Sequence, residues 1–390
     1  MHSFNSPRCS LAKLHQPSHI PGLQALRGLS ALLVFCQHIF WQASIVTPGL
    51  EQTLYRLNFG GIGVLCFFAL SAFLVSGKAS DPPKRFLAER LRRIVPGFWL
   101  ALLLASALDY MRLGVNGLTW QVFFFLPVGM QPGVTVPYWT LYYEVLLYLV
   151  IFFIARLSPR WVAPFIVLWA VVAWIWQDRP YGNGHYLFPT WYHLVFPIFA
   201  GFFASGIWVA WCAQRHVAES RRHSMLVLYT VLACMCFQTP LLTEWLPGFA
   251  TVLYEWPALI LPKLLHGDIG MLYFLAGTAC ALRAALLWPA HGPIGRFLRR
   301  MGDYSYGIYL MHIAIIWVGI WLLQLMGLFP SYVTTALLLT AFSLPLSVIC
   351  GWGEFRLQQW LKSQDRHRTH LEHAEPVQAI PVAGNSVIGP

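Results

Sequence analysis

The sequence predicts an all-α, polytopic membrane protein with about ten transmembrane helices and both termini in the cytoplasm. Three features support this: the composition, the recurrence of apolar stretches, and the placement of basic residues between them. Of the 390 residues, 57% are hydrophobic and 11% are charged, whereas soluble domains carry about a quarter charged residues. The composition therefore excludes a soluble enzyme and a disordered protein.

Ten apolar segments are long enough to be transmembrane helices, which need roughly 20 mostly apolar residues. They lie at 26–46, 60–77, 94–112, 139–155, 161–177, 190–212, 224–242, 269–289, 304–327 and 332–352. The stretch 243–268 is also apolar but contains Pro247, Pro257 and Pro262. We interpret it as an irregular external loop, with an eleventh span as the alternative.

The basic residues distinguish between ten and eleven spans. With both termini in the cytoplasm, 22 of the 26 Lys and Arg residues fall on the cytoplasmic side and 4 fall outside. This asymmetry has the direction that the positive-inside rule requires. An eleventh span would place the basic cluster at 296–300 outside, so ten spans is the preferred topology. The same short clusters between apolar stretches argue against nucleic-acid binding, despite a formal net charge of +11.

The domain organisation follows from these segments. Residues 1–22 contain three prolines and no apolar run, so we expect a disordered cytoplasmic N-terminus and no cleaved signal peptide. Residues 23–352 form the membrane domain. Residues 353–390 are predicted to be a largely disordered cytoplasmic tail. The eight cysteines include no C-x-x-C pair, so neither a metal site nor a disulfide framework is expected.

Arg27 and His38 are ionisable residues of the first span, and such residues are functional candidates because they are costly in a membrane. Eleven residues separate them, which is about 1100° of helix rotation, or roughly 20° after three full turns. Both should therefore face the same way, roughly 16 Å apart along the axis. Arg27 would lie at the cytoplasmic interface and His38 just past mid-membrane. A neutral imidazole is a natural general base for a hydroxyl.

Glu144 lies in the run PYWTLYYEVLLYL, about one turn inside the fourth span. Its depth is compatible with that of His38. A carboxylate there can orient His38, accept a hydrogen bond from a substrate hydroxyl, or pair with an arginine. Trp139, in the same run, suits either an interfacial aromatic belt or stacking against a sugar ring.

Further polar residues lie on the second and ninth spans. Ser71 lies among small and aromatic residues, and close helix packing through the small ones is the simpler interpretation. Ser305, Tyr309 and His312 are spaced i, i+4, i+7 and share one helix face. That face would carry a hydroxyl, a phenol and an imidazole into the interior.

The loop between the second and third spans reads KASDPPKRFLAERLRRIVP. Its charges set the topology, but they also suit a phosphorylated cytoplasmic ligand, because Arg binds phosphate bidentately. Arg90 and Arg93 lie one turn apart on a predicted short helix, so they can act together.

Taken in order, these segments resemble acyltransferase family three, integral membrane acyltransferases that modify bacterial surface glycans. The resemblance runs from about Leu23 to Trp352. It is carried by five runs, LRGLSALLVFCQH, GGIGVLCFFALSAFLVS, RFLAERLRRIVPGFW, YWTLYYEVLLY and YSYGIYLMH. Ala72 stands where the family usually has Gly in its Ser-Gly-Phe motif.

The resemblance implies transfer of an acyl group, usually acetyl, from cytoplasmic acetyl-CoA to a sugar hydroxyl at the bacterial inner membrane. It places Arg27 and His38 at the catalytic centre, Arg90 and Arg93 towards the donor, and Glu144 near the acceptor. The substrate-binding candidates are Ser71, Trp139, Ser305, Tyr309 and His312.

Several alternatives stay open at this point. Direct transfer with His38 as general base is preferred over an acyl relay through a side chain. Succinyl or longer donors remain possible, as do an exopolysaccharide, an O-antigen or a lipid-linked sugar as the acceptor. Polysaccharide-assembly partners would be separate chains. The competing function is a non-catalytic carrier or flippase, which would not need acetyl-CoA.

Overall fold

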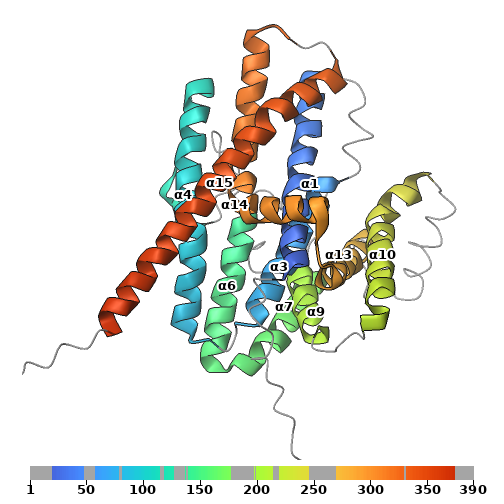
Figure 1. Cartoon of the computed structure of the whole chain (residues 1–390), viewed down its shortest axis with the longest axis vertical. Helices are drawn as coiled ribbons and strands as arrows, with labels where there is room; N and C mark the ends of the chain where they lie inside the picture. Colours follow the sequence, from blue (N-terminus) through green and yellow to red (C-terminus); the bar gives the residue numbers. More distant parts are fainter. Residues whose placement is uncertain are drawn as a thin grey trace, which may run out of the picture.

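Figure 1 shows the computed structural model of the chain as an assembly of helices. The structure describes residues 20–47, 58–78, 81–114, 118–126, 137, 139–176, 197, 199–213, 219–245, 269–328 and 331–373. Within these ranges all regular structure is helical and no strand occurs, as the sequence predicts. Most of the N-terminal segment and most of the proposed loop at 243–268 lie outside the described residues.

The helices are named in chain order. Their bounds are α1 Pro21–Val46, α3 Phe59–Ser76, α4 Pro83–Leu113, α5 Trp120–Phe123, α6 Trp139–Leu157, the 3-10 helix η3 Pro159–Trp161, α7 Val162–Trp176, α9 Ala200–Cys212, α10 Glu219–Trp245, α13 Ile269–Leu287, α14 Gly292–Leu325 and α15 Tyr332–His373. Each of the ten predicted apolar segments coincides with one of these helices in whole or in part.

Six helices are long and apolar enough to cross a membrane, judged by length and composition within the described residues. They are α1, α3, α4, α6, α14 and α15 as far as Gln364. Three further apolar helices are shorter, at Pro159–Ile175, Ala200–Cys212 and Met271–Leu287. The chain is therefore a multi-pass, all-α membrane protein.

Two of these helices extend well beyond the predicted spans. α4 begins at Pro83, so the basic cluster expected on a short separate helix forms the first turns of a helix that continues into the membrane segment. α15 continues to His373, so residues 353–373, expected to belong to a largely disordered tail, are helical. Both extensions are rich in Leu, Arg, Glu, Gln and Lys, which favour helix. Residues 374–390 lie outside the described residues.

Near the site, α1 and α14 cross with their backbones in close contact. A Cβ on Gly28 would collide with the carbonyl oxygen of Leu298, and one on Gly302 with that of Gln24. Small residues of this kind let two helix backbones touch. In Figure 1, α15 crosses α14, and α10 and α13 lie side by side at the right. The crossing fixes the polar face of α1 against that of α14.

Ala72, the departure from the Ser-Gly-Phe motif, is fully buried where α3 packs against α9. A Cβ on Gly206 of α9 would lie 3.1 Å from the Cβ of Ala72. The missing side chain at Gly206 therefore makes room for the additional methyl group of Ala72, and the two helices still approach closely.

Candidate active site

A polar pocket lies where α1, α3, α4, α6 and α14 meet, and it encloses about 760 Å³ including its open mouth. Seven of the ten residues proposed from the sequence line it: Arg27, Ser71, Arg90, Arg93, Glu144, Ser305 and Tyr309. These residues come from five different helices and span almost 300 positions of sequence. The fold therefore brings most of the predicted site together.

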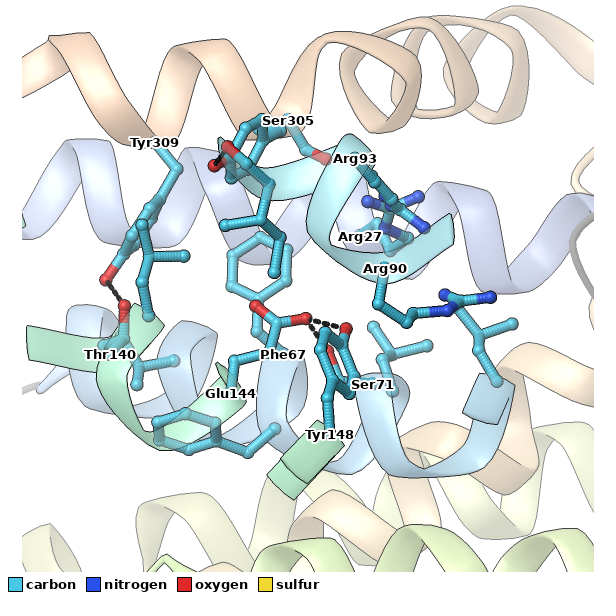
Figure 2. A pocket seen from close by; sticks show the side chains of 17 residues that line it. Arg27, Phe67, Ser71, Arg90, Arg93, Thr140, Glu144, Tyr148, Ser305 and Tyr309 are labelled. Atoms are coloured by element: carbon cyan, nitrogen blue, oxygen red, sulfur yellow. Dashed lines mark hydrogen bonds between the residues drawn. The ribbon is translucent and has the colours of Figure 1, made fainter. Parts of the chain in front are cut away.

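Three arginines gather at one side of this pocket, as Figure 2 shows. Arg27 comes from α1, and Arg90 and Arg93 come from α4. Arg90 is buried and its Nε has no hydrogen-bond partner within the described part of the chain. Its guanidinium lies 5.8 Å from the ring centre of Phe86 and 6.0 Å from that of Tyr148. With three guanidinium groups and one carboxylate in the lining, the pocket favours an anion.

Glu144 is held by hydrogen bonds to a single one of its oxygens. The Ser71 hydroxyl donates to Oε1 at 2.9 Å, and the Tyr148 hydroxyl donates to the same atom at 2.5 Å. These bonds fix the carboxylate between α3 and α6, and Oε2 has no hydrogen-bond partner among the described residues. The geometry leaves Oε2 for a hydrogen bond from a bound substrate.

Tyr309 lies at the side of the pocket opposite the arginines (Figure 2). Its hydroxyl is 2.8 Å from that of Thr140, and either oxygen can be the donor. Its ring centre is 5.8 Å from that of Phe67 and 5.8 Å from that of His312. Tyr309 therefore contacts both the pocket and the residues beyond it.

His38 and His312 lie outside the pocket lining and form a pair of their own. Nε2 of His312 is 3.3 Å from Nδ1 of His38, and the ring centres are 4.8 Å apart. His312 is 1% exposed. The predicted common face of Ser305, Tyr309 and His312 is confirmed, since the first two line the pocket and the third adjoins Tyr309. The roles of these residues remain predictions.

Trp139 is not in the pocket lining. Its ring centre lies 6.4 Å from that of Tyr143 and 5.7 Å from that of Phe199, within an aromatic cluster between α6 and the start of α9. Ser71, for which helix packing was the simpler interpretation, instead lines the pocket and bonds Glu144.

The sequence reasoning missed three polar residues of the lining: Thr140, Tyr148 and Tyr306. A signal for two of them was present, because Thr140, Glu144 and Tyr148 are spaced i, i+4, i+8 and share one face of α6. Tyr306 donates a 2.6 Å hydrogen bond to the carbonyl of Ile94, a contact between distant helices that spacing does not reveal. Among the residues that the structure describes, no group of three His, Cys, Asp or Glu could hold a metal ion.

Comparisons with known proteins agree with the geometry. The sequence model of a family described as an acyltransferase domain matches residues 20–352, which include all the proposed site residues. The exopolysaccharide production protein ExoZ of Rhizobium meliloti (strain 1021) is 34% identical over 113 residues, covering 26% of this chain and 36% of that protein. The match thus spans about a third of that relative's length. No solved structure gives a significant match.

Proposed function

This chain belongs to the acyltransferase domain family, and on that premise we propose that it moves an acetyl group from cytoplasmic acetyl-CoA to a glycan hydroxyl. The observation that carries the proposal is the cluster of Arg27, Arg90 and Arg93 in one pocket. Coenzyme A carries several phosphates, and arginine is the side chain best suited to grip them. The buried Nε of Arg90, which has no hydrogen-bond partner among the described residues, supports an anionic ligand at this place.

The donor would extend from the arginines towards His38. Arg27 and His38 lie roughly 16 Å apart along one helix face, a separation that an extended pantetheine arm can span. Tyr309 lies between the pocket and the histidine pair. The phosphates would stay with the arginines while the thioester reaches the neighbourhood of Tyr309 and His38.

In the proposed reaction, His38 takes the proton of the acceptor hydroxyl. The hydroxyl oxygen then bonds to the acyl carbon as the carbon–sulfur bond to coenzyme A breaks. The departing thiolate receives the proton from His38, so the products are an ester and free coenzyme A. Glu144, with Oε1 occupied by Ser71 and Tyr148, offers Oε2 to a substrate hydroxyl or amide.

We also propose that the chain lies in the cytoplasmic membrane of a bacterium. It would cross that membrane ten times, with both termini in the cytoplasm. The distribution of 22 basic residues inside against 4 outside supports it. This orientation places the start of α4, with Arg90 and Arg93, at the side where acetyl-CoA is made. The acceptor would be an exopolysaccharide or its lipid-linked precursor, because the curated relative is an exopolysaccharide production protein. Separate polysaccharide-assembly proteins would supply it.

The test is the O-acetyl content of surface glycan in the native host. Four strains are compared: wild type, a deletion, the deletion carrying the wild-type chain, and the deletion carrying His38→Ala. We expect the ester to be lost in the deletion and to return only with the wild-type chain. Restoration by His38→Ala at normal abundance would favour the carrier or flippase function and reject the proposed chemistry.

A further inference from the structure

Both ring nitrogens of His312 already have partners inside the protein. Nδ1 lies 2.7 Å from the carbonyl oxygen of Tyr309 and 3.2 Å from that of Ile308. Carbonyl oxygens only accept hydrogen bonds, so Nδ1 of His312 carries a proton. In a neutral imidazole the other nitrogen, Nε2, is then an acceptor. This acceptor is the atom that faces His38.

The neighbours of His38 likewise determine which of its two ring nitrogens carries the proton. Its Nδ1 lies 2.8 Å from the carbonyl oxygen of Val34 and 3.3 Å from Nε2 of His312. Both neighbours are acceptors, so Nδ1 of His38 carries a proton shared in a three-centre hydrogen bond. Nε2 of His38 is therefore the nitrogen without a proton, and it is the atom able to act as a base.

We propose that His312 is the positioning residue of His38, and that it does not contact the substrate. This inference rests on the proposed function. His312 holds the imidazole of His38 with Nε2 unprotonated. When His38 takes a proton from the acceptor hydroxyl, Nε2 of His312 accepts the hydrogen bond of the resulting cation.

The arrangement resembles the role of aspartate in a Ser–His–Asp triad, where the third group fixes the tautomer and stabilises the imidazolium. Here the third group is a neutral imidazole. A buried carboxylate would add a second charge to desolvate inside the membrane, which is costly. A neutral acceptor gives the orientation without that charge.

Packing immobilises His312. Its side chain is 1% exposed, and its ring centre lies 6.5 Å from that of Phe35 and 5.8 Å from that of Tyr309. A buried imidazole with both nitrogens occupied has no atom left for a substrate. His38 is only partly buried, and its Nε2 is the nitrogen left for a substrate.

The proposed reaction leaves the protonation state of His312 unchanged. The acceptor hydroxyl proton moves to Nε2 of His38 as the ester bond forms and the carbon–sulfur bond breaks. The same proton then passes to the coenzyme A thiolate. His312 keeps its own proton on Nδ1 throughout, and His38 returns to its starting tautomer.

The test uses the full chain in inverted membrane vesicles of the native host, with radiolabelled acetyl-CoA as the probe. The rate of label entering glycan and lipid-linked sugar is measured over a series of acetyl-CoA concentrations, and rates are corrected for protein abundance. His312→Leu removes the acceptor at similar size. His312→Gln keeps an amide oxygen able to accept from His38. His312→Met replaces the Leu variant if the latter does not accumulate.

We expect His312→Leu to lower the maximal rate by about 10- to 100-fold, the loss expected for one hydrogen bond to a charged group. The KM for acetyl-CoA should change less than about twofold, and His312→Gln should recover most of the rate. Equal losses in both variants, a change confined to KM, or a wild-type rate in His312→Leu would each overturn the inference. His38→Ala, assayed in parallel, separates the two proposals, because label transfer without His38 would instead reject the proposed function.

Discussion

The Ser71 hydroxyl of α3 donates a 2.9 Å hydrogen bond to Oε1 of Glu144 on α6. Because Tyr148 donates to the same oxygen, the carboxylate is fixed from two helices. A serine that by itself indicates helix packing thus orients the acidic group of the pocket.

Removing either donor should lower activity without unfolding the protein. Ser71→Ala and Tyr148→Phe each delete one charge-assisted hydrogen bond, worth about 1.5–3 kcal/mol, so we expect losses of about 10- to 100-fold in label transfer. The double variant should fall further than either. Ser76→Ala on the same helix is the matched control, since the Ser76 hydroxyl donates to the backbone carbonyl of Phe73 on its own helix. Wild-type activity in both single variants would contradict a role for Glu144.

Replacing Arg90 or Arg93 by Ala should weaken donor binding. Each loses a guanidinium able to hold a phosphate, so the KM for acetyl-CoA should rise by about 10-fold or more while the maximal rate changes little. Arg90→Lys should recover little, because an ammonium group lacks the planar fork. The exposed Arg92 lies between them, and Arg92→Ala should behave as wild type. A defect confined to the acceptor would reject the assignment.

The hydroxyl pair of Thr140 and Tyr309, 2.8 Å apart, should contribute to stability as one unit. Thr140→Val and Tyr309→Phe each remove the same hydrogen bond, and each should lower the free energy of unfolding by about 1 kcal/mol. The double variant should lose less than the sum of the two. Thermal unfolding of the detergent-solubilised protein measures this. Strictly additive losses would show that the bond does not join α6 to α14 in solution.

The glycine crossing of α1 and α14 should not tolerate a side chain. Gly302→Val would force the backbone away from the carbonyl of Gln24, and overpacking of this kind typically costs about 1–3 kcal/mol. We expect reduced abundance, a lower Tm and loss of activity. Gly353→Ala on α15 is the control, because among the described residues no atom beyond its own stretch of helix lies within 4 Å of the added Cβ. An unchanged Tm for Gly302→Val would mean that the helices separate more easily than the structure implies.

Spacing along a single helix was the most informative part of the sequence. It predicted the shared face of Ser305, Tyr309 and His312, which the structure confirms. It could not show that Ser71 meets Glu144 or that His38 meets His312. Those contacts depend on how separate helices pack, and apolar faces in a membrane carry little information about which neighbour each one meets.

Hydropathy located the apolar helices but not their ends. α4 begins at Pro83 and α15 ends at His373, each beyond the apolar run that marked it. Hydropathy records where side chains become polar, whereas the helix continues as long as residues of high helix propensity follow.

The requirement for His38 is measured by label transfer from radiolabelled acetyl-CoA in membrane vesicles that carry either His38→Ala or His291→Ala. His291 is an exposed histidine at the start of α14, so its variant controls for the loss of an imidazole as such. At equal abundance, we expect no label in glycan or lipid-linked sugar with His38→Ala and a wild-type rate with His291→Ala. A wild-type rate with His38→Ala would contradict it.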